Sequence, residues 1–164
     1  MPTISVENYL KAIFHLQSEL PENRVKTKEL AETLEISLPS VTSMLKSLGD
    51  DGLVEYVPYK GARLTPRGRK VALKVIRNHR LIEVFLVRTL GYTWDEVHAE
   101  AERLEHAISD KLADRIDDFL ARPRFDPHGD PIPRSDGTLP AEPLVSLTQM
   151  QPGQCGVLRR VGTN

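Results

Sequence analysis

The sequence contains one cysteine, few aromatic residues and no long apolar run. Cys155 is the only cysteine among the 164 residues, so an intrachain disulfide and a zinc site built from several thiolates are both excluded. No apolar stretch approaches the roughly 18 residues of a membrane span, and no charged leader precedes an apolar block at the N-terminus. We therefore expect a cytoplasmic protein of one or two domains that has no membrane partner.

The charge is divided unevenly along the chain. The net charge is only −1, but residues 24–80 contain 12 Lys and Arg against 6 Asp and Glu, whereas residues 81–130 contain 6 against 12. Such segregation predicts one surface for an anionic partner such as nucleic acid and another for cations.

The first 65 residues have the pattern of a winged helix-turn-helix. Ser37 is a good N-cap, and Pro39 lies in the first helical turn, where its missing N–H costs little. Apolar spacing and turn residues predict helices over residues 6–20, 27–36 and 37–52, the last of them ended by Gly49 or Gly52, and a hairpin over residues 53–65, with Pro58 and Gly61 at its tip. Two helices joined by a few residues and followed by a wing are typical of a DNA-binding domain.

The candidate DNA contacts are small hydroxyls, a proline and basic side chains. Hydroxyls approach base edges and phosphates closely, proline offers an apolar surface to a thymine methyl group, and Lys or Arg neutralises phosphates. The predicted set is Thr27, Lys28, Ser37, Pro39, Ser40, Thr42, Ser43, Lys46, Lys60 and Arg63. A winged helix that binds protein instead of DNA is the alternative, and the local positive charge favours DNA.

The remainder of the chain divides into a helical part, a linker and a short tail. Thr65-Pro66 opens a helix that Gly91 ends, and a capping box at Thr93–Glu96 opens another that is expected to reach Leu120. Six of the twelve prolines fall within residues 122–143, and short strand-like runs follow. The predicted domains are 1–65 (winged helix), 66–121 (helical), 122–143 (proline-rich linker) and 144–164 (the incomplete beginning of a small β domain).

The stretch "HAEAERLEH", residues 98–106, combines two histidines and three carboxylates. On a continuous helix, Val97, Ala101, Leu104, Ile108 and Leu112 would form the buried stripe, and His98, Glu102, Glu105 and His106 would form a flank beside it. His79 and Glu83 on the preceding helix would face this flank. Neutral imidazole and carboxylate are ligands for divalent ions, and facing helices can hold such sites.

Each of these side chains alone is more commonly a solvated charge or, for His79, a core histidine, but together they predict a metal site. Two alternatives remain: a metallohydrolase with an open metal position, and a metal-independent winged-helix regulator that responds to a small organic ligand. His15 and His128 have no assigned role, and His128 is expected to be solvated in the linker. Cys155 is expected to be a small strand residue.

Several blocks of the sequence resemble one family. "ENYLKAIF", "SLPSVTSMLKSLGDDGLV", "LTPRGRKVA", "NHRLIEVFL", "VHAEAERLEHAISD" and "DPHGDPIP" are similar, in order, to blocks of the diphtheria toxin repressor family of iron- and manganese-dependent transcriptional repressors. The resemblance covers nearly the whole chain. It implies a mainly α protein with a winged-helix domain, a helical dimerisation and metal-binding domain, and a C-terminal SH3-like domain of which only the first strands would be present.

The resemblance also assigns the ligands. His79, Glu83 and His98 match the family's ancillary metal site, and Glu102, Glu105 and His106 match its regulatory site, to which Asn8 would add an amide oxygen. Iron-sensing members have cysteine at the position of Glu102 and methionine at that of Asn8, and manganese-sensing members have carboxylates at both. Glu102 therefore favours Mn(II), with Fe(II) as the alternative, and Zn(II), Co(II) or Ni(II) as substitutes in vitro.

The resemblance implies a regulator and not an enzyme. The expected partner is double-stranded DNA with a palindromic operator, bound by a homodimer, with no small-molecule substrate. Phe85, Leu86 and Trp94 are candidates for the dimer interface or, equally, for the core.

Overall fold

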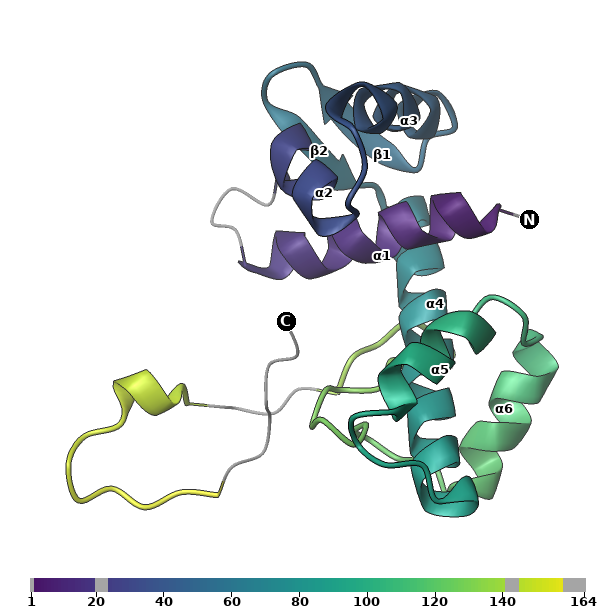
Figure 1. Cartoon of the computed structure of the whole chain (residues 1–164), viewed down its shortest axis with the longest axis vertical. Helices are drawn as coiled ribbons and strands as arrows, with labels where there is room; N and C mark the ends of the chain where they lie inside the picture. Colours follow the sequence, from purple (N-terminus) through teal and green to yellow (C-terminus); the bar gives the residue numbers. More distant parts are fainter. Residues whose placement is uncertain (1, 20–23, 141–144, 158–164) are drawn as a thin grey trace. The chain divides into compact units, whose positions relative to one another are not determined.

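The computed structural model describes residues 2–19, 24–140 and 145–157 (Figure 1). The chain divides into two compact units, Met1–Val75 and Ile76–Asn164. The boundary falls inside one helix, α4 (Pro66–Phe85). Each unit has its own buried apolar cluster or clusters.

The first unit is the predicted winged helix-turn-helix. Its elements are α1 (Ile4–Glu19), α2 (Thr27–Thr33), α3 (Leu38–Asp50), β1 (Val54–Val57) and β2 (Gly61–Leu64). Ser37 caps α3, because its Oγ accepts the N–H of Ser40 at 3.4 Å. The helix α2 starts where the Glu29 carboxylate accepts the Lys26 N–H at 2.7 Å. Leu20, the last residue of the first predicted helix, lies outside the described residues.

The core of the first unit lies between the three helices and the hairpin. Val41, Leu45 and Leu48, the predicted inward residues of α3, are completely buried. They pack in one cluster with Leu10 and Ile13 of α1 and with other apolar residues of the unit. Burial of an apolar side chain of this size contributes about 1.5–3 kcal/mol, so this cluster fixes the orientation of α3.

The wing is an antiparallel hairpin in which Val54 lies opposite Leu64 and Val57 opposite Gly61. Val25 adds a short bridge to it, with backbone N···O distances of 2.8 and 2.9 Å to Ala62. Gly61 has a φ of +104°, and a Cβ atom there would lie 2.3 Å from the carbonyl oxygen of Val25. Only glycine allows the wing to approach residue 25 this closely.

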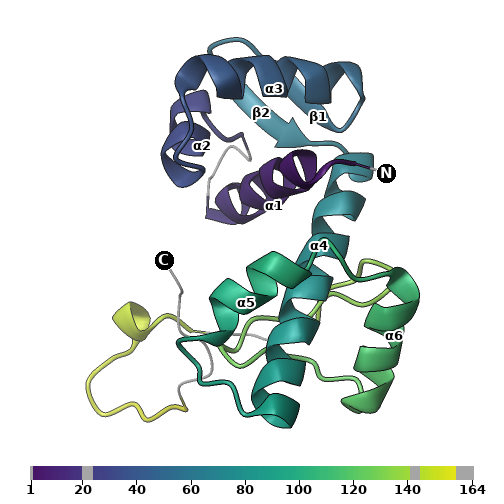
Figure 2. The same cartoon turned by 45° about the vertical axis from the view of Figure 1, so that its right-hand side comes forward.

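In the second unit, α5 (Val97–Leu104) and α6 (Asp110–Phe119) lie on either side of α4, as both views show (Figures 1 and 2). Ile82 and Leu86 pack with Val97 and Ala101, and Leu81 packs with residues of α6. After Phe85, one π-helical turn (Leu86–Leu90) continues the helix to Gly91, whose φ of +72° ends it as predicted.

The prediction of one helix from residue 93 to Leu120 is wrong. The helix α5 ends at Leu104, a turn follows, and Ser109 starts α6 by accepting the Leu112 N–H at 3.2 Å. Because the break changes the direction of the chain, Leu112 leaves the apolar stripe and is 47% exposed. Glu105 and His106 therefore lie in the turn after α5 and not on a continuous helix.

The proline-rich linker is irregular, as expected, but part of it is well packed. Ile132, Pro133 and His128 are buried. In residues 145–157 the structure shows a single 3₁₀ turn, Leu147–Gln149, and no strand, so the strand expected at Cys155 is absent and this cysteine is exposed. Residues 141–144 and 158–164, which are the end of the predicted linker and the first and last residues of the predicted β tail, lie outside the described residues.

The segment Asp126–Pro131 folds around one carboxylate. Asp126 Oδ1 accepts the backbone N–H groups of His128 and Asp130, each at 2.8 Å. Arg80 of α4 donates to the Pro131 carbonyl oxygen at 2.6 Å, and its Nε lies 3.5 Å from Asp126 Oδ2. Burial raises the pKa of Asp126. The segment is thus held against α4, and the term "Asp126 loop" is used for residues 126–131.

Within the part of the chain that the structure describes, no helix combines the length and the apolar character needed to cross a membrane.

Gly68 provides a test of the contact between α4 and the hairpin. A Cβ atom at Gly68 would lie 1.9 Å from the Leu53 carbonyl oxygen, so Gly68→Ala should lower the free energy of unfolding by more than about 2 kcal/mol. Gly49 lies inside α3 with its nearest such contact at 3.9 Å, so Gly49→Ala should raise stability by up to about 1 kcal/mol. Urea denaturation measures both, and equal stability of the two variants would contradict the close approach.

The Asp126 loop provides a second test. Asp126→Ala removes the acceptor of two N–H groups and should lower the free energy of unfolding by about 1–3 kcal/mol. Asp126→Asn keeps an oxygen at the same place, so its loss should be clearly smaller. The comparison is made by urea denaturation, and equal losses for Ala and Asn would show that the two hydrogen bonds do not hold the loop.

Candidate metal centre and nucleic-acid interface

Six predicted metal ligands come together in the second unit. The helix α4 supplies two of them, α5 supplies two, and the turn that follows α5 supplies two. The residues are His79 and Glu83, His98 and Glu102, and Glu105 and His106. Contacts between neighbouring side chains join all six into one network.

His79 lies at the centre of this network. Its Nδ1 is 2.6 Å from Glu105 Oε2, and its Nε2 is 3.0 Å from Glu83 Oε1 and 3.1 Å from His98 Nδ1. A neutral imidazole carries a proton on only one nitrogen. Without an ion, His79 donates a hydrogen bond to Glu83, whereas in a metal-bound centre its remaining proton would lie on Nδ1, shared with Glu105, and the Nε2 lone pair would face Glu83 and His98. This is the arrangement in which a histidine binds a metal while a carboxylate orients it from behind.

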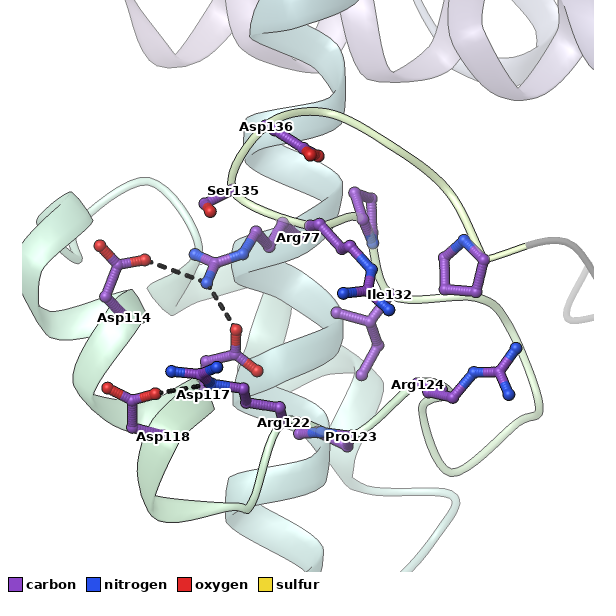
Figure 3. A pocket seen from close by; sticks show the side chains of 13 residues that line it. Arg77, Asp114, Asp117, Asp118, Arg122, Pro123, Arg124, Ile132, Ser135 and Asp136 are labelled. Atoms are coloured by element: carbon purple, nitrogen blue, oxygen red, sulfur yellow. Dashed lines mark hydrogen bonds and ion pairs between the residues drawn. The ribbon is translucent and has the colours of Figure 1, made fainter.

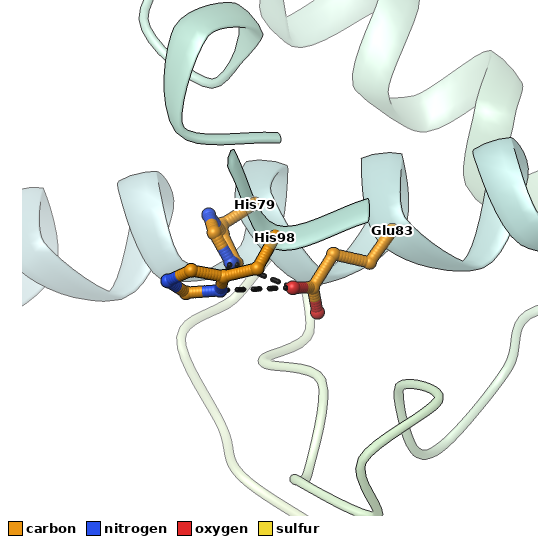
Figure 4. A group of neighbouring side chains, drawn as sticks. All are labelled: His79, Glu83 and His98. Atoms are coloured by element: carbon orange, nitrogen blue, oxygen red, sulfur yellow. Dashed lines mark hydrogen bonds and ion pairs between the residues drawn. The ribbon is translucent and has the colours of Figure 1, made fainter. Parts of the chain in front are cut away.

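Glu83 is a buried and ionised carboxylate. It is 1% exposed, and Figure 4 shows its carboxylate turned toward the His79 and His98 rings. Burial raises the pKa of Glu83, but hydrogen bonds from His79 and His98 and the charges of His79 and His128 outweigh it, so that the pKa falls from 4.5 to about 2. A permanent negative charge beside two imidazoles suits a cation.

The side chains form three groups whose ligand atoms lie within 4.8 Å of one another. The first, His79, Glu83 and His98, is the predicted ancillary set. The second contains His79, Glu102 and Glu105, so His79 occupies the place that the prediction gave to His106. His106 remains next to this group, with its Nε2 3.2 Å from Glu105 Oε1.

The third group, Glu83, Asp126 and His128, was not foreseen. His128 was expected to be solvated, and this is wrong: it is 6% exposed, and its Nδ1 lies 3.5 Å from Glu83 Oε2. The signal in the sequence is "DPHGDP", in which an aspartate precedes a glycine-containing turn that it can cap. That signal predicts a compact turn but does not say what the turn packs against.

Asn8 belongs to the first unit, on α1, where it is half-buried. The six ligands described above belong to the second unit. The assignment of Asn8 as a ligand therefore stays a prediction.

The predicted DNA contacts lie in the first unit, and most of them are exposed. Ser37, Pro39, Ser40, Ser43 and Lys46 are exposed at or on α3, Lys28, Lys60 and Arg63 are exposed on α2 and the wing, and Thr27 and Thr42 are half-buried. The buried face of α3 and its exposed polar face are thus separated as a recognition helix requires.

Some of these side chains already have partners within the chain. Thr42 Oγ1 donates to the Leu38 carbonyl oxygen at 2.9 Å, and the hydroxyls of Ser37 and Ser40 are 2.8 Å apart. The Arg63 guanidinium is 2.7 Å from the Glu55 carboxylate. Their contacts with DNA would have to replace or add to these bonds.

A cavity of about 450 Å³ lies between α4, α6 and residues 122–140, and no predicted site residue lines it. Arg77 reaches from α4 to α6, where its Nη2 lies 3.0 Å from Asp114 Oδ1 and 2.8 Å from Asp117 Oδ2 (Figure 3). Arg122 is paired in the same way with Asp118 at 2.9 Å. The Arg77 pairs join α4 to α6, and the Arg122 pair joins residue 122 to α6. These charged residues of the cavity therefore have a structural role.

The dimer candidates are divided between core and surface. Leu86 is buried and Phe85 is half-buried in the apolar clusters, whereas Trp94 is 49% exposed and packs on His128. The structure thus assigns Leu86 to the core.

Two protein-family models together match most of the chain. Residues 1–62 match the model of the iron-dependent repressor N-terminal DNA-binding domain, and residues 65–134 match that of the iron-dependent repressor metal-binding and dimerisation domain. The iron-dependent repressor IdeR of Mycobacterium leprae (strain TN) is 36% identical over 157 residues, which are 91% of this chain and 67% of that protein. The chain spans 55% of the length of the Mycobacterium tuberculosis and Mycobacterium bovis regulators that it matches.

Manganese regulators are similar as well. The transcriptional regulator MntR of Geobacillus kaustophilus (strain HTA426) is 37% identical over 120 residues, which are 73% of this chain and 83% of that protein. A solved manganese-dependent transcriptional repressor in complex with manganese is 44% identical, with a TM-score of 0.86 over 96% of this chain and 72% of that chain.

These proteins are DNA-binding regulators and not enzymes, which argues against the metallohydrolase alternative. The resemblance noted in the sequence is confirmed, and the chain belongs to the family of iron- and manganese-dependent transcriptional repressors.

Proposed function

We propose that this chain represses transcription by binding a palindromic operator as a homodimer when it is loaded with Mn(II) or Fe(II). The observation that carries the proposal is the network around His79 and Glu83, where a buried, ionised carboxylate and several imidazoles lie within ligand distance of one another. A repressor of this kind acts where the chromosome lies, so its proposed location is the cytoplasm.

The donors suit a divalent first-row metal. The network offers imidazole nitrogen and carboxylate oxygen, which bind Mn(II), Fe(II), Co(II), Ni(II) and Zn(II). His79, Glu83 and His98 would hold one ion, and Glu102, Glu105 and His106, with Asn8, would hold the regulatory one. The Glu102 carboxylate favours Mn(II), with Fe(II) as the alternative.

The ion would act by linkage. An ion that binds the DNA-competent conformation better than the others shifts the population toward it, and bound DNA must then tighten metal binding by the same factor. The metal supplies only positive charge and fixed ligand geometry, and the side chains of the chain supply the specificity.

A two-fold dimer would present two copies of α3 to the DNA. Their centres would be spaced by about one turn of the duplex, roughly 34 Å, or a little more. Exposed Ser43 and Lys46 of α3, with Lys28 of α2 and Lys60 of the wing, would contact the major groove and the flanking phosphates.

The first test removes the regulatory ligands. The operator is selected from random DNA, and the affinity of the full chain is measured in chelator, with Mn(II), with Fe(II) under anaerobic conditions and with Zn(II). The metal-dependent gain, expected at about 5- to 150-fold for an allosteric effector, should disappear when Glu105 and His106 are both changed to Ala.

Glu100→Ala is the matched control. Glu100 also lies on α5, but it is paired with Arg103 at 3.2 Å, outside the ligand network, so this variant should keep the full metal response. Equal operator affinity of the wild type in chelator and in metal would overturn the proposal in favour of a metal-independent regulator.

The second test concerns α3. Lys46→Ala should weaken binding to all DNA sequences by a similar factor and should reduce the slope of log affinity against log salt by about 1, because one phosphate contact is lost. Lys111→Ala removes an exposed lysine of α6 and should leave the slope unchanged. Fluorescence anisotropy at several salt concentrations measures both, and an unchanged slope in Lys46→Ala would exclude Lys46 as a phosphate contact.

A further inference from the structure

Trp94 packs on His128, a member of the third ligand group of the metal centre. The centroids of the two rings are 4.8 Å apart with an angle of 53° between their planes. Trp94 is 49% exposed, whereas His128 is 6% exposed. The indole therefore has one side in solvent and the other on an imidazole that is otherwise buried.

The polar contacts of His128 do not by themselves fix its ring. Asp126 Oδ1 holds the His128 backbone N–H at 2.8 Å, which sets where the side chain starts. The ring then meets Glu83 only through a long contact of 3.5 Å between Nδ1 and Oε2. Since the terminal torsion of histidine has broad minima, packing has to determine which ring edge faces Glu83.

Trp94 is well placed to supply that packing. It lies in the turn before α5, where the Glu96 carboxylate accepts the Thr93 N–H at 3.1 Å and the Thr93 hydroxyl at 2.5 Å. The Val97 N–H also donates to the Thr93 carbonyl oxygen at 3.2 Å. These bonds hold both flanks of Trp94, so the indole is presented by a fixed turn and not by a long free segment.

We propose that Trp94 is a positioning residue of the metal centre: its indole holds the His128 ring with Nδ1 toward Glu83 and shields that edge of the centre from water. Packing of one ring against the other restricts rotation of the imidazole, and removal of water strengthens the electrostatic contact between imidazole and carboxylate. Loss of such an outer partner typically lowers metal affinity about 10- to 100-fold. The inference rests on the proposed metal binding.

The contact between the two rings is tested first without metal. Trp94 is the only tryptophan, so tryptophan fluorescence reports on the surroundings of this one side chain. In the metal-free chain, His128→Ala should make Trp94 more accessible to acrylamide and should shift its emission to longer wavelength. Unchanged quenching and emission would show that the two rings are not in contact, whatever the result with metal.

The positioning role is tested by a double-mutant cycle with Mn(II) as the ligand. Trp94→Ala should weaken Mn(II) binding about tenfold, and Trp94→Phe, which keeps an aromatic face, should restore most of the affinity. In the His128→Ala background, Trp94→Ala should have almost no further effect. A general loss of structure would weaken binding in both backgrounds, so additive effects would overturn the proposal.

Phe119→Ala is the matched control. Phe119 is another exposed aromatic of the second unit, 68% exposed and packed edge-on against Phe85, and its removal should leave Mn(II) affinity within about twofold. Analytical ultracentrifugation of each variant shows whether an altered dimer explains a change in affinity. If the wild type binds no Mn(II), the proposed function fails together with this inference, whereas full affinity of Trp94→Ala overturns this inference alone.

Discussion

The arrangement of the second unit depends on Glu83, a carboxylate that is almost fully buried and still ionised. Placing a charge out of water costs several kcal/mol unless partners compensate for it, and Glu83 is compensated by imidazoles from three directions. His79 comes from the same helix, His98 from α5 and His128 from the Asp126 loop. Three segments of the second unit therefore converge on one negative charge, and the same convergence creates a place for a cation.

The helix α4 makes this convergence possible because four consecutive polar residues within it are all buried. Arg77 contacts Asp117 of α6, Asn78 donates to the Glu105 carbonyl oxygen at 3.0 Å, and Arg80 donates to Pro131. His79, between them, reaches the metal centre. Because successive residues of a helix point in different directions, the four residues join α4 to three neighbours: α6, the turn after α5 and the Asp126 loop. Polar pairs, as well as apolar packing, thus position the ligands.

The features that were predicted correctly depend on local signals. Ser37 with Pro39, Thr65 with Pro66, and Gly91 mark helix ends by the bonding needs of the adjacent backbone, and these needs are visible in a few residues. Helical spacing on two neighbouring segments predicted that His79 and Glu83 would face the flank that begins at His98, and the family resemblance singled out these three residues as one set. Both kinds of inference use distances along the chain that the geometry of a helix fixes.

The features that were missed depend on competition or on distant contacts. Ser109 favoured the start of a new helix, whereas the apolar spacing through Ile108 to Leu112 favoured one continuous helix. The structure has the new helix, capped by Ser109. His128 was misjudged because proline and glycine indicate irregular backbone, which is not the same as exposed backbone. Its burial depends on Asp126, Arg80 and Trp94, and the contacts with the last two cross more than 30 residues of sequence.

The three ligand groups share side chains, and this limits how ions can fill them. The group of His79, Glu83 and His98 has His79 in common with the second group and Glu83 in common with the third, whereas the second and third groups have no residue in common. Binding through both nitrogens of His79 at once would require an imidazolate. His79 therefore serves one ion through a single nitrogen, whereas the two oxygens of Glu83 can serve groups on both of its sides. Two ions bound at the same time must divide the donors so that His79 belongs to one of them, as in the proposed assignment, in which His106 completes the second set.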